Sequence, residues 1–331
     1  MLEPSLSEAF RSIEVPGEHT ICWKKLLSYL GPGALVAVGY MDPGNWSTDL
    51  AAGSAYGYRL LFVVLLSSLI AMFLQCLAVK AGVGYSRDLA QICRDNYSST
   101  ISTFLWLIME TAIAATDLAE VIGGAIAFKL LFGIPLVGGI LMTAADVLIV
   151  LFMRGSHIRT IEAIILVLVL IIGVCLVVEL SYSKPAVLDV LLGFLPRTEI
   201  VTGEGMLFVS IGIIGATVMP HNLFLHSSLI LTRASRTDAQ GQIEAVRYAT
   251  FDTIMSLFYA FFVNAALLIV SASAFYVNGY TDIATLQDAY HLLQPVLGGK
   301  GASILFGTAL LASGQSATFT GNFLCRSEEV V

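Results

Sequence analysis

The chain has 331 residues, of which 57% are hydrophobic and 12% are charged, and its formal net charge is −7 at pH 7. A soluble domain usually carries about twice that charged fraction, so lipid must solvate much of the surface. The dispersed charge forms no basic patch, which excludes a nucleic-acid partner. The sequence also contains no nucleophile–base set and no nucleotide-binding loop, so we do not expect an enzyme.

Long apolar stretches dominate the chain. A membrane-crossing helix needs about 20 mostly apolar residues. Residues 1–29 are polar and mixed in charge, which predicts an N-terminal tail. The apolar stretches then follow at 30–53, 60–80, 99–128, 134–153, 160–180, 205–232, 249–277 and 301–321. We therefore expect an all-α polytopic membrane protein with about eight transmembrane helices and a short polar tail at 322–331.

The distribution of basic residues predicts the orientation. If the N-terminus lies in the cytoplasm, most of the 17 lysine and arginine residues fall in cytoplasmic segments, as the positive-inside rule requires. We expect an integral, multi-pass protein with a cytoplasmic N-terminus. We also expect it to be a monomer in the lipid bilayer of the plasma or inner membrane rather than of an organelle.

Helix-breaking residues interrupt the first and the sixth stretch. Asp42-Pro43-Gly44-Asn45 lies within the first, and Pro220 lies within the sixth. Proline removes a backbone donor, and glycine permits non-helical dihedral angles. The two broken helices are five helices apart, so they run in opposite directions, which is typical of an inverted repeat. We assign repeat one to 30–180 and a partial repeat two to 205–321.

The two breaks together predict a metal site. Unwound backbone at membrane depth is tolerated only where it lines a cavity or binds something. Asp42 and Asn45 offer side-chain oxygens, and unwinding of the sixth helix exposes the carbonyl of Ala216 beside the thioether of Met219. Sulfur favours softer divalent ions over Ca²⁺ and Mg²⁺. The alternatives are that Asp42 lies on a surface loop and that Met219 is an ordinary packing residue.

Titratable residues near the breaks predict a proton pathway. Glu110, Asp117 and Glu120 share one face of the third stretch, and carboxylates at membrane depth must face water, cations or one another. His221 and His226 follow Met219, and histidine changes charge near neutral pH. The alternatives are an ion-pair face with Arg233 as its basic partner, and histidines that are hydrogen-bonded within the bundle.

These motifs resemble the natural resistance-associated macrophage protein (Nramp) family. The resemblance rests on Asp42-Pro43-Gly44-Asn45, on Met219-Pro220-His221, and on residues 111–120 and 312–321, which look like the third and eighth helices of that family. It covers residues 30–321. It implies a leucine-transporter-type fold and proton-coupled symport of Mn²⁺ or Fe²⁺, and also of Cd²⁺ and Co²⁺, with no permanently bound cofactor.

The resemblance also implies roles for individual residues. Asp42, Asn45, Ala216 and Met219 match the positions that hold the metal. His221, Asp117 and Glu120 match positions that move protons, and Arg233 matches a position that pairs with acids. His226 and Glu110 remain candidates for the same pathway on their own chemistry.

Two other function classes stay open at this point. One is a sodium-coupled symporter of an organic solute, which the acidic Asp42 and the soft Met219 disfavour. The other is a non-transporting, shortened fragment or a receptor-like descendant of a transporter. The second repeat is incomplete after its third helix, which favours this reading.

Overall fold

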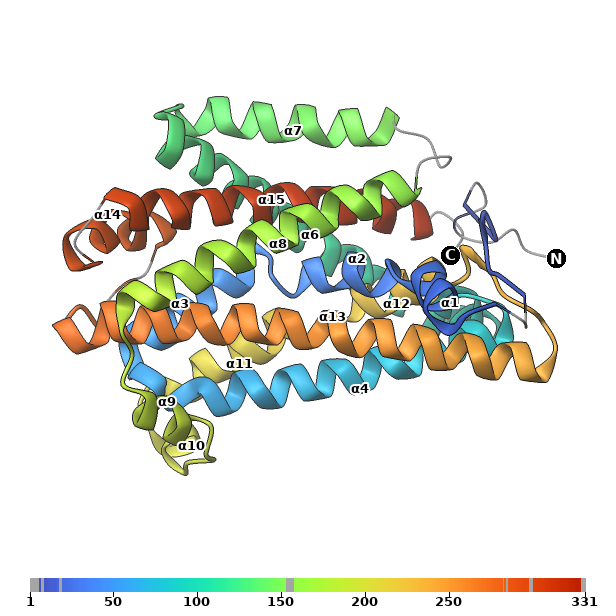
Figure 1. Ribbon diagram of the computed structural model, residues 1–331, viewed down its shortest axis with the longest axis horizontal. Helices are drawn as coiled ribbons and strands as arrows, with labels where there is room; N and C mark the ends of the chain where they lie inside the picture. Colours follow the sequence, from blue (N-terminus) through green and yellow to red (C-terminus); the bar gives the residue numbers. More distant parts are fainter. Residues whose placement is uncertain are drawn as a thin grey trace.

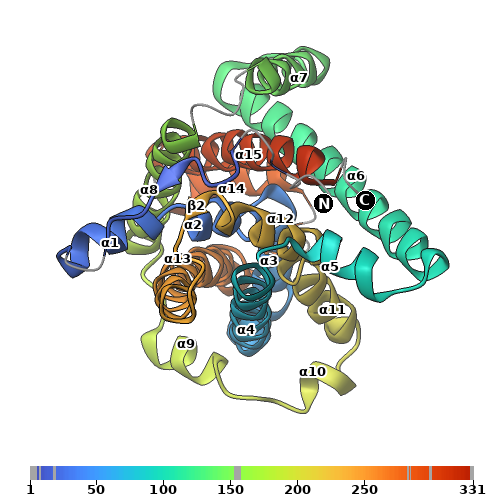
Figure 2. The same cartoon turned by 90° about the vertical axis from the view of Figure 1, so that its right-hand side faces the viewer.

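The computed structural model describes residues 6, 9–17, 20–152, 158–281, 283, 285–297 and 300–328. Long helices pack side by side along the longest axis, and both termini lie at one end of the bundle (Figure 1). Figure 2 looks along the bundle from that end and shows α4 and α13 within the bundle, α7 at one margin, and α9 and α10 at the opposite margin.

The helices of the first half are α1 (Cys22–Tyr29), α2 (Pro32–Gly39), α3 (Pro43–Tyr56), α4 (Leu61–Tyr85), α5 (Leu89–Asn96), α6 (Ser99–Phe132), α7 (Leu136–Phe152) and α8 (Ile158–Ser183). Those of the second half are α9 (Val187–Gly193), α10 (Glu199–Thr202), α11 (Met206–Thr217), α12 (Pro220–Ile230), α13 (Ala239–Ala274), α14 (Leu286–Leu297) and α15 (Lys300–Glu328). Short 3-10 helices, η1 (Gly57–Leu60) and η3 (Tyr276–Asn278), follow α3 and α13.

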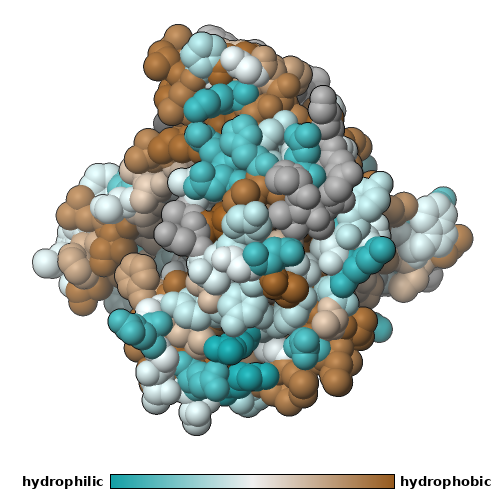
Figure 3. All heavy atoms as spheres, turned by 90° about the vertical axis from the view of Figure 1, so that its left-hand side faces the viewer, coloured by the Kyte–Doolittle hydropathy of each residue, from teal (hydrophilic) through white to brown (hydrophobic). Residues whose placement is uncertain are grey.

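Helices occupy all eight ranges expected from the apolar stretches. Within the described residues, five helical runs are long and apolar enough to cross a membrane: Pro43–Tyr85, Ser99–Phe132, Ile158–Ser183, Met206–Ile230 and Ala239–Asn278. Their outer faces expose large apolar side chains such as Phe73, Leu118 and Phe208. At the end opposite the termini, hydrophilic side chains gather across the middle of the face, and apolar ones flank them (Figure 3). The prediction of an integral membrane protein is confirmed.

The first and sixth helices are broken as predicted. The first is split into α2 and α3, and the sixth into α11 and α12, which run in the opposite direction (Figure 1). Asp42 caps α3 by accepting a hydrogen bond from the backbone nitrogen of Asn45 at 2.8 Å, and Pro43 opens that helix. In the sixth helix, Met219 has extended backbone and Pro220 opens α12.

The ends of the chain differ from the sequence expectation. In the predicted tail 1–29, β1 (Ile13–Glu14) pairs in parallel with β2 (Arg233–Ala234), and Leu6 and Ala9 are buried against the bundle. This two-stranded ladder is a small exception to the all-α prediction. At the other end, α15 continues to Glu328, through most of the segment expected to be a polar tail.

Close contacts between helices fix the position of the first break. A Cβ atom on Gly123 of α6 would lie 2.3 Å from the ring of Pro43, so only glycine lets α6 pack directly against the break. Gly53 of α3 contacts α13 equally closely, because a Cβ atom there would lie 2.5 Å from the carbonyl oxygen of Leu268. α6 therefore packs against the first break itself, and α13 packs against α3 further along that helix.

Candidate metal site

Three oxygen atoms converge on one side-chain nitrogen at the helix breaks. Asn45 Nδ2 donates to Asp42 Oδ1 at 2.7 Å, to the carbonyl oxygen of Ala216 at 3.0 Å and to that of Gly39 at 3.2 Å. Asp42 and Asn45 are 3% and 2% exposed, so this cluster is shielded from solvent. The predicted ligands Asp42, Asn45 and Ala216 are thus brought together from both broken helices.

The cluster has the chemistry of a cation site. The amide nitrogen of Asn45 carries only two hydrogens, yet three acceptor oxygens surround it. A cation at the same point satisfies all three oxygens at once. A half-turn of the Asn45 amide, whose oxygen and nitrogen are nearly equal in size, adds a fourth oxygen. In the structure that oxygen accepts a hydrogen bond from Thr217 Oγ1 at 3.4 Å.

Met219 lies three residues after Ala216 and lines a small cavity. The cavity has a volume of about 20 Å³, and its walls include Gly39, Met219, His221, Asp117 and Glu120. That volume accommodates about one water-sized occupant. Gly39 belongs to both features, because it lines the cavity and directs its carbonyl oxygen at Asn45. The thioether and the predicted proton carriers therefore adjoin the oxygen cluster.

The predicted proton carriers face the cavity from two helices. Asp117 and Glu120 lie one turn apart on α6, the first half-buried and the second 6% exposed. His221 comes from the first turn of α12, and its Nδ1 has no hydrogen-bond partner among the atoms that the structure describes. Gly123, one turn beyond Glu120, touches Pro43 and so holds this acidic face against the first break.

His226 lies outside the cavity, in a chain of hydrogen bonds. Its Nδ1 is 2.9 Å from Gln75 Oε1, and its Nε2 is 3.5 Å from Thr253 Oγ1. Gln75 Nε2 in turn donates to the hydroxyl of Tyr40 at 3.0 Å, and Tyr40 belongs to the first break. The alternative of a histidine hydrogen-bonded within the bundle describes His226 well.

Glu110 and Arg233 also lie away from the cavity. Glu110 is exposed on α6, two turns before Asp117. Arg233 pairs with an acid as expected, but the acid is Glu162 of α8 rather than one from the third stretch, with Nη1 to Oε1 at 2.8 Å. Burial lowers the pKa of Arg233 below its usual value, although the neighbouring Glu162 carboxylate opposes this shift.

The arginine pair holds the start of the first broken helix. Arg233 donates to the carbonyl oxygens of Ser28 at 3.2 Å and Leu30 at 2.8 Å, just before α2. From the opposite side, Asp252 Oδ2 of α13 accepts from the backbone nitrogen of Gly33 at 2.8 Å. Sequence reasoning missed Glu162 and Asp252. Both are carboxylates within apolar stretches, and that signal alone could have marked them as candidates.

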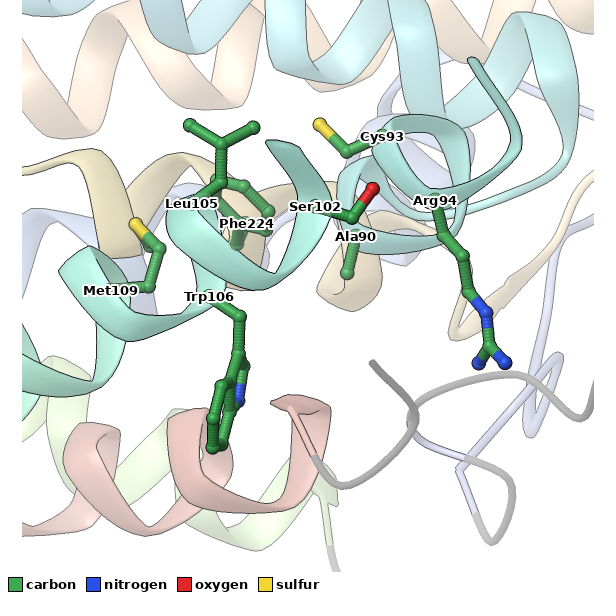
Figure 4. A pocket seen from close by; sticks show the side chains of 8 residues that line it. All are labelled: Ala90, Cys93, Arg94, Ser102, Leu105, Trp106, Met109 and Phe224. Carbon is green, nitrogen blue, oxygen red and sulfur yellow. The ribbon is translucent and has the colours of Figure 1, made fainter. Parts of the chain in front are cut away.

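A second hollow in the bundle has a mainly apolar lining and lacks the ligands of a cation site. It lies between α5, α6 and α12, and Leu105, Met109, Trp106 and Phe224 form much of its wall (Figure 4). Its one charged lining residue in the described part of the chain is Arg94, which points away from the apolar side chains. The side chains that line this hollow offer no oxygen-rich centre, so the oxygen cluster and the cavity at the breaks form the candidate site.

The architecture defines the class of protein. Two discontinuous helices run in opposite directions, and their breaks meet inside a bundle of apolar helices. Such breaks are how secondary transporters with inverted repeats build their substrate sites. The fold is that of a multi-pass membrane transporter of the leucine-transporter type, as predicted.

Comparison with known proteins gives the family. Residues 33–324 match the natural resistance-associated macrophage protein-like family. The chain belongs to this family of metal ion transporters, so it is not an enzyme.

Several known proteins are similar to this chain in sequence or structure. A divalent metal cation transporter of Nostoc is 51% identical over 317 residues, which are 96% of this chain and 72% of that protein. A transporter with the same description from Bradyrhizobium diazoefficiens is 51% identical over 316 residues, or 96% of this chain and 70% of the relative. The crystal structure of a manganese transporter from Eremococcus coleocola superposes with a TM-score of 0.88 at 39% identity, covering 99% of this chain and 70% of that one.

Proposed function

We propose that this chain carries Mn²⁺ across a membrane in symport with protons, and that Fe²⁺, Cd²⁺ and Co²⁺ are alternative substrates. The observation that carries the proposal is the convergence of Asp42, Asn45 and the Ala216 carbonyl oxygen, with Met219 in the wall of the cavity that Gly39 shares with this cluster. The descriptions of the Nostoc and Eremococcus relatives as divalent metal and manganese transporters support the class of ion.

The ligand set suits a transported transition metal. A single carboxylate with neutral oxygens gives moderate affinity and leaves coordination positions for water, so the ion can both enter and leave. The Met219 thioether adds a soft ligand, which Mn²⁺ and Cd²⁺ accept better than Ca²⁺ or Mg²⁺ does. The four ligands of the proposed site are Asp42, Asn45, Ala216 and Met219.

Protons leave the site through the cavity that Met219 lines. His221 lies two residues beyond Met219, and Asp117 and Glu120 line the same cavity from α6. A cation that arrives at Asp42 adds positive charge beside these groups, which favours release of a proton. Glu110 and His226 do not line this cavity, so the proposed route runs through His221, Asp117 and Glu120. Arg233 holds the start of α2 through its contacts with residues 28 and 30.

The proposed topology follows from the distribution of basic residues. The N-terminus, residues 1–29 and the arginine pair lie on the cytoplasmic side of a plasma or inner membrane. Residues 30–321 form the transport domain, with repeat one at 30–180 and the partial repeat two at 205–321. We propose that the domain works as a monomer.

The function is tested in vesicles that contain the purified chain and a trapped pH indicator. The membrane potential is set negative inside, and Mn²⁺ is added outside. Mn²⁺ is then expected to enter together with protons, which acidify the interior. Ca²⁺ at the same concentration is expected to do neither. Mn²⁺ entry with no acidification would exclude proton coupling, and absence of Mn²⁺ entry in vesicles with verified protein incorporation would contradict transport by this chain.

Asp117→Asn is expected to separate the two fluxes. The substitution keeps all four metal ligands and removes one carboxylate from the wall of the cavity. Mn²⁺ entry should therefore persist in part while acidification per Mn²⁺ falls several-fold. The control is Asp95→Asn, which removes an exposed carboxylate of α5 that pairs with Arg87 and should change neither flux. Unchanged acidification in Asp117→Asn would show that protons bypass α6.

A further inference from the structure

A buried carboxylate near the far end of α8 takes no part in the metal site or in its cavity. Glu179 lies four residues before α8 ends at Ser183, and it is 0% exposed. Neither of its side-chain oxygens has a hydrogen-bond partner within the part of the chain that the structure describes. Among the buried carboxylates of that part, Glu179 is the one with both oxygens unpaired. A strongly polar group in this state needs a physical explanation.

A second glutamate of α8 shows how this protein holds an ionised carboxylate. Glu162 lies four residues after α8 begins at Ile158, so Glu162 and Glu179 each lie about 6 Å from opposite ends of the helix. Glu162 is buried as well, but it accepts hydrogen bonds from Arg233 at 2.8 Å and from Arg159 at 3.0 Å. Glu179 is buried at the corresponding depth without either kind of partner.

The charges at the inner end of the bundle do not reach Glu179. Helices α2, α13 and α15 pack against α8. α2 contains no charged residue, and the charged residues of α13 end at Asp252. Asp252 lies at the level of Glu162, because both carboxylates approach Gly31. About 25 Å of helix separate that level from Glu179, so the carboxylate and arginine groups there are too distant to bind it.

The outer halves of the same helices contain few titratable groups. Cys175 lies one turn before Glu179 on α8 and is buried. Tyr259 of α13 donates its hydroxyl to a backbone carbonyl oxygen of α8 at 2.9 Å. α15 has no charged residue between its first residue, Lys300, and its last turn, and Lys184 is exposed just beyond the end of α8. Lysines therefore follow or precede these helices in sequence, while the described atoms around Glu179 supply no hydrogen bond.

We propose that Glu179 is a proton-binding site, separate from the metal site and from the cavity that Met219 lines. Burying an ionised carboxylate without a partner costs far more than burying the neutral acid, so the packed helices hold Glu179 with its proton. When water reaches the side chain, the O–H bond breaks, its electron pair stays on the carboxylate, and the proton passes to water. α8 ends at the end of the bundle opposite the termini, so this exchange is with the outer side (Figure 1). That side assignment rests on the proposed topology.

The test is infrared spectroscopy of the full chain in liposomes near neutral pH, which separates the carbonyl stretch of a neutral carboxylic acid from the bands of ionised carboxylates. The variant is Glu179→Gln, which keeps the shape and the neutrality of the protonated side chain. The matched control on the same helix is Glu162→Gln, which removes a carboxylate that is held by arginine. Thermal unfolding of each chain is measured in parallel. Neither measurement requires Mn²⁺ transport, so its outcome is independent of the vesicle assay.

The wild type is expected to show a neutral-acid band that Glu179→Gln lacks and Glu162→Gln retains. On transfer to D₂O this band should shift, and more slowly than the bands of exposed groups exchange, because water must first reach a buried side chain. The melting temperature of Glu179→Gln should stay at the wild-type value.

Three results would overturn the proposal. A neutral-acid signal that is the same in the wild type and in Glu179→Gln would show that Glu179 is ionised. A melting temperature that falls in Glu179→Gln as far as in Glu162→Gln would show that an ion pair was lost. A band that never shifts in D₂O would show a proton that does not exchange with water, and hence no proton-binding site.

Discussion

Replacing Asp42 with asparagine is expected to weaken Mn²⁺ binding about 100-fold without unfolding the site. Asp42 is the one carboxylate in the proposed ligand set, so its charge supplies most of the attraction for a divalent cation. It is also the cap of α3, because it accepts from the backbone nitrogen of Asn45. Asparagine caps helices as well as aspartate does, so this substitution removes the charge and keeps the cap.

A matched control separates the two roles of Asp42. Asp88 caps α5 in the same way, by accepting from the backbone nitrogen of Gln91 at 2.9 Å, and it is also buried. Asp88→Asn should leave Mn²⁺ affinity unchanged in a calorimetric titration of purified protein. If both variants lose affinity equally, capping and not ligation explains the effect of Asp42, and the metal lies elsewhere.

Replacing Arg233 with methionine is expected to destabilise the protein by about 3 kcal/mol, since it leaves the Glu162 carboxylate buried without its closest partner. This loss of stability lies near the lower end of the range for broken buried ion pairs, because Arg159 also contacts Glu162, with Nη1 to Oε2 at 3.0 Å. Methionine keeps much of the apolar volume of the arginine stem, so packing changes little. The measurement is thermal unfolding of purified protein in detergent.

Arg159→Met is the comparison for this substitution. Its side chain is 43% exposed, so removing it should cost less than about 1 kcal/mol. Restoring charge balance with Glu162→Gln in the Arg233→Met background should recover part of the lost stability. Equal effects of the two single substitutions would show that burial does not distinguish the pairs and that Arg233 does not hold the start of α2.

The sequence predicts the broken helices well because their causes are local. Pro43, Gly44 and Pro220 interrupt apolar stretches that are otherwise long enough to span, and the structure breaks at the same places. The apolar stretch predicts a helix from residue 249, ten residues after α13 begins at Ala239. Its first turns are polar, so hydropathy cannot detect them. The capping residue Asp238, which accepts from the backbone nitrogen of Gly241 at 3.4 Å, was the available signal.

Contacts between distant segments were less accessible from the sequence. The convergence of Asp42 with Asn45 could be expected from their spacing, but the role of the Gly39 carbonyl depends on how α2 ends. The pairing of Arg233 with Glu162 brings together residues 71 positions apart, and no periodicity reports such a contact. The parallel pairing of β1 with β2 likewise depends on the position of the segment that follows α12.

The contribution of sulfur is the most direct test of the proposed site. Calorimetric titrations with Mn²⁺, Cd²⁺ and Ca²⁺ compare the wild type with Met219→Ala and with Met109→Ala, which truncates a buried methionine in the apolar hollow of Figure 4. Met219→Ala is expected to lower the affinities for Mn²⁺ and Cd²⁺ relative to Ca²⁺ by about tenfold, because only the softer ions gain from a thioether. Met109→Ala should leave that ratio unchanged. Equal losses for all three ions in Met219→Ala would show that Met219 acts through packing and would contradict a sulfur ligand at the helix breaks.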